Sequence, residues 1–523
     1  MFLAEFNNYS KISKTLCIFL VFLGIAIFIA LSISTDRLYL IIALGMVGMF
    51  FMNPIYILFL IIILNPFSDW IVVNYPSLFS KVMTDIFVVI FILVTMARKI
   101  AMRKSWIVTP FHKWVFVLLI FYLMSGFLHW TNIEDFMFMN WVHFRFVYLA
   151  VGITQLNLND RKYYGVIKVL ILVYFIHLAI GLFQVVGGEW AKDLVYQGSQ
   201  NISLSYGLLH YSNYDTAFEF NLAGFTYIYS TFFSPSHFGS FLLLMICLVF
   251  GMRKARLNFQ ANKYSKPFIA NKMSVYSVFI KKKYYCLILI LTTIEICLTF
   301  NRSTYIGFFV LISFIIISSG SSLRKLVIYE TVLIAVTFSI FNMESLINYL
   351  EGVSNPGIGT FDPIARGLSI FSTYFLQDTP RKIAYWNILP RIITETPLFG
   401  LGVTSVLNQE NIVGTTIVIS DSLRYVYGDA GLVRLFVEFG MLGSLIFGLL
   451  FFKVFNFARK GYILANKYEE RVLCFAVVTG IITLVPVSIG TMLIISKSYG
   501  LYLWMFIGFS QRWRVNNQLG CLK

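Results

Sequence analysis

Long apolar runs separated by short polar segments make up most of the chain. A helix that crosses a membrane needs about 20 mostly apolar residues, with roughly 17–25 tolerated. Fourteen runs approach or reach this length, and we predict a membrane helix from each. Their ranges are 15–34, 38–52, 55–66, 82–97, 114–130, 141–156, 163–186, 231–251, 284–300, 305–319, 326–341, 431–457, 472–495 and 499–513.

The second and third runs are short, and Asn53-Pro54 separates them. Proline removes a backbone donor and breaks or kinks a helix. Two interpretations stay open here: two short spans, or one long tilted helix kinked at Pro54. The first run is long and lacks a small-residue cleavage site, so we do not expect it to be a cleaved signal peptide.

Composition agrees with this pattern. Hydrophobic residues make up 58% of the 523 positions and charged residues only 12%, against about 25% charged in soluble domains. These values exclude a disordered chain, a fibrous repeat and an ordinary soluble enzyme, and favour an all-α polytopic membrane protein. The six cysteines are scattered, mostly inside apolar runs, so neither a disulfide nor a metal site is expected.

The net charge of +17 reports orientation rather than a nucleic-acid partner, because cytoplasmic loops retain Lys and Arg. Segments 1–14, 98–113, 157–162, 252–283, 320–325, 458–471 and the end from Arg512 hold 27 basic residues; the short loops on the other side hold five. Both termini are therefore predicted to be cytoplasmic, which requires an even number of spans, fourteen or twelve. Loop 252–283 has nine basic and no acidic residues, which fits topology alone or contact with anionic lipid.

Two long loops fall on the outer side. Loop 187–230 is rich in aromatic residues, and loop 342–428 is the largest segment outside the predicted spans. A loop of that length is either functional or disordered, and its aromatic residues favour order, with short helices. We divide the chain into 1–341, 342–428 and 429–523, which form one integral membrane unit. The chain has no glycine-rich nucleotide loop, so we expect neither ATP nor a nucleotide sugar as the energy source, and no cofactor.

Arginines collect at the predicted outer face, where the positive-inside bias makes them uncommon. They are Arg145, Arg302, Arg366, Arg381, Arg391 and Arg434, with Arg145 predicted near the outer end of its span. A forked guanidinium suits a phosphate best, so these side chains predict an anionic phosphate ligand at that face. Arg434 and Glu438 are four residues apart and share a helix face, so a structural ion pair is the alternative for Arg434.

Segment 381–396 has apolar residues at helical spacing, at Trp386, Leu389 and Ile393. This pattern predicts a short helix lying on the outer membrane surface. Pro390 fits only if it occupies the first turn of a second helix. Arg391 and Glu395 are again four residues apart and are predicted to share a face.

Four segments together resemble the O-antigen polymerase and ligase superfamily, the Wzy-type polymerases of bacterial surface polysaccharides. They are SPSHFG at 234–239, FNRSTYIG at 300–307, the outer-loop segment from Arg391 to Gly402 with PLFGLG at 397–402, and DAGLVRL at 429–435 followed by EFGMLG at 438–443. Their order and the long outer loop before a closing helix carry the resemblance, which covers under half of the chain. In the ligases a histidine usually stands nine residues before the glutamate that matches Glu438. Here that residue is Asp429, and we take this difference to favour a polymerase.

The resemblance implies a multi-pass helical bundle in the bacterial inner membrane. It implies a metal-independent glycosyltransferase that polymerises undecaprenyl-diphosphate-linked repeat units into O-antigen, the polysaccharide of lipopolysaccharide, or a similar glycan at the periplasmic face. The implied partners are the lipid-linked glycan, membrane lipids and a chain-length regulator protein. Two alternatives stay open: an O-antigen ligase that transfers the glycan to an acceptor, and a polysaccharide-lipid flippase or other transporter. Transporters often contain repeated halves with binding groups at the membrane midplane, and neither feature is evident in the sequence.

In such a reaction the arginines would stabilise the leaving diphosphate, and a general base would take the acceptor proton. Candidates for the base are Asp429, Glu395 and His237, with Glu438 expected to pair with Arg434. Asp429 stands where the ligases carry histidine, and Ala430-Gly431 after it leave room for a sugar. Helix capping is the alternative role for Asp429, because Asp is a favoured N-cap residue. Two roles are likewise open for His237: it is either the general base or a histidine packed at the membrane interface.

The charge bias generates a prediction about topology. Reporter fusions after Gln409 and Asn262 should report the periplasm and the cytoplasm, respectively, because the two positions lie in loops of opposite predicted side. Paired alkaline phosphatase and fluorescent protein fusions measure this. The reverse result at either position would separate the arginines from a common face and remove the phosphate argument.

Overall fold

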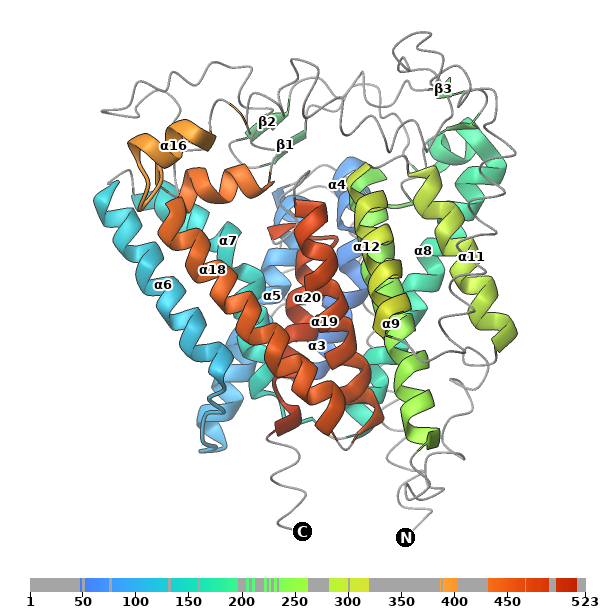
Figure 1. The fold of residues 1–523 in the computed structure, drawn as a ribbon, viewed down its shortest axis with the longest axis horizontal. Coiled ribbons are helices and arrows are strands. Elements are labelled where there is room, and N and C mark those ends of the chain that lie inside the picture. The colour runs from blue at the N-terminus through green and yellow to red at the C-terminus, as the bar shows by residue number, and fades with distance from the viewer. Residues whose placement is uncertain are drawn as a thin grey trace.

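The structure is a computed structural model, and its fold is a bundle of membrane helices (Figure 1). It describes residues 48, 52–74, 78–129, 133–158, 160–195, 204–206, 209–211, 221–222, 225–226, 230–232, 235–261, 282–299, 302–318, 386, 389–402, 431–465, 467–488 and 495–514. Statements about structure below concern these residues. Of the predicted site residues, Arg366, Arg381 and Asp429 lie outside them.

The helices, in chain order, are α3 (Pro54–Leu64), the 3-10 turn η1 (Asn65–Phe67), α4 (Ser68–Asn74), α5 (Leu78–Ala101), α6 (Pro110–Leu128), α7 (Ile133–Gln155), α8 (Asp160–Val195), α9 (Pro235–Ala261), α11 (Lys282–Leu298), α12 (Arg302–Ser318), α16 (Leu389–Glu395), α18 (Gly431–Leu464), α19 (Tyr468–Ser488) and α20 (Gly500–Ser510). Two short antiparallel hairpins, β1 (Leu204–Tyr206) with β2 (Leu209–Tyr211) and β3 (Asn221–Leu222) with β4 (Phe225–Thr226), add strands within loop 187–230.

Seven helices in the described part of the chain are long and apolar enough to cross a membrane, which makes this a multi-pass helical membrane protein. They are Pro54–Ile71, Pro110–Leu128, Ile133–Gln155, Arg161–Gly188, Ser236–Arg256, Gly431–Leu464 and Tyr468–Ser488. Shorter apolar helices occupy Tyr285–Leu298, Ser303–Ser318 and Gly500–Ser510. Predicted runs 15–34 and 326–341 lie outside the described residues, as does nearly all of 38–52, so the count of fourteen and the orientation stay predictions.

The third predicted span begins and ends at identifiable signals. Asn53 is the N-cap of α3, its side chain accepting a hydrogen bond from the backbone N–H of Ile55 at 3.2 Å, and Pro54 follows at the start of the helix. Pro54 therefore begins a helix, where its missing N–H costs nothing. The helix ends at Leu64, two residues before the predicted end, and the turn at Asn65–Phe67 leads into α4.

The helix predicted from residue 231 starts later, at Pro235, because polar contacts hold the residues before it in another conformation. The Gln184 side chain of α8 bonds both the backbone N–H of Ser230 at 2.8 Å and its carbonyl at 3.0 Å. The Thr231 hydroxyl donates to the carbonyl of Pro66 at 2.9 Å. These bonds fasten the end of loop 187–230 to α8 and to the turn before α4.

Packing places the most apolar helices at the centre. All eleven residues of α20 are buried, and α20 packs against α7 and α19. A helix that is apolar on every side belongs in such an interior. Figure 1 shows α19 and α20 in the middle, with α6 and α18 on one side and α8 and α11 on the other. The outer helices expose apolar side chains such as Phe116, Leu172 and Phe452, as expected where a helix meets lipid.

Helix α18 is broken at Gly440, whose φ of +63° lies outside the helical range. The break frees backbone groups that the helix would otherwise pair internally. Residues after α16 supply the partners: Met441 N–H donates to the Pro397 carbonyl at 2.8 Å, and Leu401 N–H donates to the Val437 carbonyl at 2.7 Å. We call this contact between 396–402 and 437–442 the Gly400–Gly440 junction.

Glycine is required on both sides of the junction. Gly400 also has a positive φ, +68°, and a Cβ there would overlap the carbonyl oxygen of Val437. A Cβ on Gly440 would overlap the backbone of Gly400 and Leu398. The PLFGLG and EFGMLG segments, which the sequence presents as separate motifs, are thus two halves of one contact.

This close approach predicts the cost of adding a methyl group. Gly440→Ala and Gly400→Ala should each lower the free energy of unfolding by at least about 1–2 kcal/mol, the cost of the left-handed conformation for an alanine, and the overlap adds to it. Thermal unfolding in detergent measures the effect.

Gly448→Ala is the matched control, since Gly448 lies on the same helix and a Cβ there would meet nothing within 4 Å. It should be neutral or slightly stabilising, because alanine is the better helix former. Equal losses of unfolding free energy for Gly440→Ala and Gly448→Ala would show that the junction does not require a glycine at position 440.

Candidate functional site

Several ionisable side chains are buried in the described part of the bundle, where burial of charge is costly and is a marker of function, and two groups contain predicted site residues. The first, the Arg434 triad, consists of Arg434, Glu438 and His143. The second, the charged cluster, consists of Asp69, Asp85, Arg145, His237 and Lys497. Neighbouring helices run alternately up and down, so α16, the start of α18 and the start of α9 share one end of the bundle (Figure 1). We call it the α16 end.

The Arg434 triad is centred on Glu438, whose side chain is 0% exposed. Arg434 Nε lies 2.8 Å from Oε1 of Glu438, which confirms the predicted pair one helical turn apart. His143 of α7 approaches the other oxygen, with Nε2 at 2.8 Å from Oε2. Both carboxylate oxygens are therefore engaged, and the pair of helices α7 and α18 is joined through them.

The hydrogen bonds of His143 define where its protons lie. Its Nδ1 is 2.8 Å from the carbonyl oxygen of Met139, and a carbonyl only accepts, so Nδ1 carries a hydrogen. One proton then lies between Nε2 and Oε2: either His143 is an imidazolium beside a carboxylate, or Glu438 is protonated. The pair can thus hold a proton on either residue without breaking its contact.

Among the described residues, Arg434 is contacted only at Nε. Glu438 contacts Nε alone, and the two terminal Nη groups make no hydrogen bond with a described residue. The side chain is 11% exposed. A guanidinium that is fixed at Nε can direct both terminal amino groups at one anionic group.

In the charged cluster, Arg145 pairs with Asp85 of α5. Its Nη1 lies 2.8 and 3.1 Å from the two carboxylate oxygens, and its Nη2 lies 3.4 Å from the carbonyl of Ile495. Arg145 was expected near the outer end of its helix. The helix begins at Ile133, eight residues before the predicted start, so Arg145 is about 18 Å along it. Arg145 is therefore an interior residue neutralised by Asp85.

Lys497 belongs to the same cluster through the turn between α19 and α20. Asn65 fixes this turn, because its side-chain amide donates to the Lys497 carbonyl at 2.8 Å. Burial lowers the pKa of the Lys497 ammonium and Arg145 adds to this, while Asp69 and Asp85 oppose it. The two carboxylates and two cations thus compensate one another in a small volume.

His237, a predicted base, lies beside an acid that the sequence did not indicate. Its Nδ1 is 4.0 Å from Oδ2 of Asp69, and its side chain is 36% exposed against 6% for Asp69. This separation is too long for a hydrogen bond, so Asp69 acts on the imidazole through its charge, which favours the protonated form.

The remaining predicted residues lie at the α16 end. Arg302 is the first residue of α12, and Arg391 lies in α16; their side-chain contacts fall outside what the structure describes. Glu395 ends α16 and is exposed. Pro390 is the second residue of α16, as expected for a proline in a first turn.

Sequence reasoning missed Asp69, Asp85, His143 and Lys497. Asp69 and Lys497 interrupt apolar runs at breaks, and a lysine in a short outer loop is itself unusual, so both gave a usable signal. Asp85 and His143 stand inside predicted spans, which also marks them. Their partners could not be inferred, because they come from other helices. The chain matches no protein-family model and no curated protein.

The triad predicts a stability effect that depends on charge. Glu438→Gln keeps the shape but leaves Arg434 and His143 without their carboxylate, so we expect a loss of about 3 kcal/mol, as when one partner of a buried pair is removed. Equilibrium unfolding in mixed micelles measures it.

Glu395→Gln is the control, because Glu395 is an exposed glutamate at the same end of the bundle. It should change stability by less than about 0.5 kcal/mol. Equal stabilities for the two variants would mean that the triad does not carry a charge interaction.

Proposed function

We propose that this protein is a glycosyltransferase that polymerises undecaprenyl-diphosphate-linked oligosaccharide units into a surface polysaccharide at the periplasmic face of a bacterial inner membrane. The observation that carries the proposal is the Gly400–Gly440 junction. It joins PLFGLG and EFGMLG, two of the segments on which the family resemblance rests, beside the Arg434 triad. Arg302 and α16 lie at the same end of the bundle (Figure 1).

In the proposed reaction, the bond between the donor sugar and its diphosphate breaks and a hydroxyl of the acceptor sugar forms the new glycosidic bond. The hydroxyl proton passes to a base, and the diphosphate leaves with its negative charge. Arginines aimed at that charge would contribute about 2.7–4 kcal/mol each if pre-organised. Arg434, Arg302 and Arg391 are the proposed contacts, with Arg366 and Arg381 as further ones.

Arg145 takes a different role in this proposal. Asp85 engages one terminal amino group through both carboxylate oxygens and compensates the charge. Its other terminal amino group lies 3.4 Å from the Ile495 carbonyl, so both ends of the Arg145 fork already have partners, whereas Arg434 is contacted by Glu438 at Nε. We therefore propose that Arg145 positions the charged cluster, including His237 and Asp69, rather than binding substrate.

The general base has two leading candidates. Asp429 lies two residues before the start of α18 and remains the candidate that the sequence favours. His237 gains support from the carboxylate of Asp69, 4.0 Å from Nδ1, whose charge would stabilise the imidazolium after proton transfer. Glu395, exposed on α16, is the third candidate.

A ligase is the second candidate function, and one observation favours it. The sequence places no histidine nine residues before Glu438, but His143 reaches Glu438 from α7. Because His143 can take the place of that histidine, its absence from the sequence position no longer separates a polymerase clearly from a ligase. Two features also support the flippase alternative, because transporters often have broken helices and polar groups deep in the membrane. Helices α3 and α18 are interrupted, and Arg145 lies in the interior of the bundle.

Arginine variants test the proposal. In liposomes supplied with undecaprenyl-diphosphate-linked oligosaccharide, the wild-type protein should lengthen the glycan, and Arg302→Ala and Arg391→Ala should abolish long chains. Lysine at either position should restore them only in part, because it keeps the charge but loses the two-point fork. Chain length is read on gels.

Arg459→Ala is the control, an exposed arginine of α18 at the opposite end of the bundle, and should polymerise normally. Full-length chains from both alanine variants at wild-type protein level would refute the arginine assignment. Movement of the lipid-linked unit across the bilayer without lengthening would identify a flippase, and transfer to a non-repeat acceptor would identify a ligase.

A further inference from the structure

Glu295 is a buried acidic residue that belongs to neither of the two polar groups described above. It lies in the last turn of α11, toward the α16 end of the bundle, and is 0% exposed. Neither of its carboxyl oxygens has a hydrogen-bond partner of normal geometry, and the backbone of Leu182 on α8 lies near them. Burial of an ionised carboxylate without a cation is costly, so this environment favours the neutral acid.

A glycine provides the space that the carboxyl group occupies. Gly181 of α8 faces Glu295, and a Cβ at position 181 would lie 2.7 Å from Oε1 and 3.0 Å from Oε2. A larger residue at this position would therefore displace the acid. The described part of α8 thus offers room for a carboxyl group here without offering a cation.

Uncharged groups close the contact between α8 and α11 beside Glu295. We call this contact, between residues 171–181 and 285–295, the α8–α11 seam. Tyr174 and Thr292, both buried, form a hydrogen bond across it. Tyr174 is the donor, because the Thr292 hydroxyl donates to the Ile288 carbonyl at 2.7 Å. The Tyr174 hydroxyl hydrogen is therefore used within the seam and is not available to Glu295.

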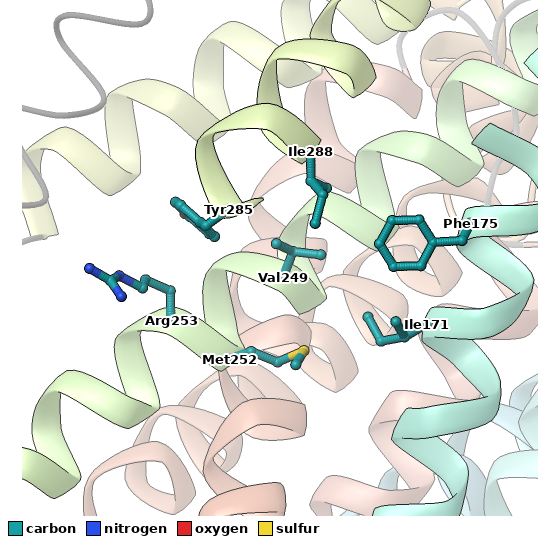
Figure 2. A pocket seen from close by; sticks show the side chains of 7 residues that line it. All are labelled: Ile171, Phe175, Val249, Met252, Arg253, Tyr285 and Ile288. Atoms are coloured by element: carbon teal, nitrogen blue, oxygen red, sulfur yellow. The ribbon is translucent and has the colours of Figure 1, made fainter. Parts of the chain in front are cut away.

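Farther from Glu295, the seam is apolar. Figure 2 shows Ile171 and Phe175 of α8 directed toward Ile288 of α11, around a space with room for about one water molecule. Ile294 and Leu172 on the outside of the two helices are exposed, as expected where a helix meets lipid. Water therefore does not solvate the acid from this direction while the seam is closed.

Helices α8, α9 and α12 pack against α11, and the cations described on them lie away from Glu295. Lys168 of α8 and the basic residues of α9 lie toward the end of the bundle opposite α16. The side chains of Lys192 on α8 and Arg302 on α12 lie outside the described residues. Glu295 thus has no cationic partner among the described side chains.

Other titratable groups on these helices have partners of their own. His177 of α8 faces the hydroxyl groups of residues 230–231. His237 of α9 lies beside Asp69, and the Tyr305 hydroxyl of α12 donates to a backbone carbonyl of α11. The proton of Glu295 is therefore not shared with these groups through any described hydrogen bond.

We propose that Glu295 is a proton-binding site that couples closure of the α8–α11 seam to the uptake of one proton. In the closed seam the carboxyl group keeps its proton, because it has neither water nor a cation to stabilise the charge. When α11 separates from α8, the group meets water and releases the proton at any pH above the pKa of an exposed glutamate, about 4.3. Acidification therefore favours the closed seam and a rise in pH favours the open one. This inference does not depend on the proposed glycosyltransferase.

Hydrogen–deuterium exchange of the full chain in lipid nanodiscs tests the site, with wild type and Glu295→Gln compared at pH 6, 7 and 8. Glutamine keeps the shape of the neutral acid but cannot release a proton, and comparison at equal pH cancels the intrinsic pH dependence of exchange. The ratio of the α11 exchange rates, wild type over variant, should rise about tenfold per pH unit, because opening releases one proton. The amides of α19 should show no such rise.

Gly181→Ala is the second variant, since it keeps Glu295 but fills the space of the carboxyl group. It should speed exchange of α11 and remove most of the pH dependence, because the displaced acid can ionise without opening of the seam. Gly448→Ala, whose Cβ would meet nothing within 4 Å, is the matched control and should behave as the wild type does. A ratio that stays constant with pH would mean that Glu295 is already ionised in the closed seam and would overturn the proposal. An equal rise in α19 would indicate global unfolding instead of seam opening and would also overturn it.

Discussion

Backbone hydrogen bonding inside the membrane is the constraint on which the rest of this structure depends. Lipid offers no partner for a free N–H or carbonyl, so a broken membrane helix needs partners from elsewhere in the protein. At Gly440 those partners are Pro397, Leu398 and Leu401. Because these bonds must form, the segment after α16 is held against α18, and its position relative to Glu438 follows from backbone geometry rather than from side-chain preference.

Charge compensation is the second determinant of the interior. Each described interior cation of the two polar groups has a carboxylate nearby, Asp85 for Arg145 and Glu438 for Arg434. The pairs differ in geometry. Asp85 binds the end of the Arg145 fork, whereas Glu438 binds Arg434 at Nε and, like the other described residues, makes no hydrogen bond with its terminal amino groups. The same pair of residue types therefore contacts one arginine at its terminal amino group and the other at Nε.

Much of the helical framework was predictable, because a membrane imposes a length and an apolar composition on each span. Local signals also predicted the place of Pro390 in α16 and the Arg434–Glu438 pair, and they marked Asn53-Pro54 as a break without deciding between a new helix and a kink. The sites were only partly predictable. Asp85 and Arg145 are 60 residues apart and His143 and Glu438 are 295 apart, and such contacts arise from helix packing that no local pattern encodes. The requirement for glycine at positions 400 and 440 likewise arises from the packing of two segments that are distant in sequence.

The burial of α20 has a consequence for how the protein is made. This helix of eleven residues spans about 16 Å, roughly half of a bilayer core, and every one of its residues is inside the bundle. It also emerges from the ribosome after all the other described helices. The contacts of α20 with α7 and α19 therefore form only after both of those helices have been synthesised. Lys497, just before α20, likewise meets Asp69 and Asp85 only after the helices that carry them, α4 and α5, and the seven or more helices that follow have been synthesised, so the charged cluster cannot be completed while its first members are being inserted.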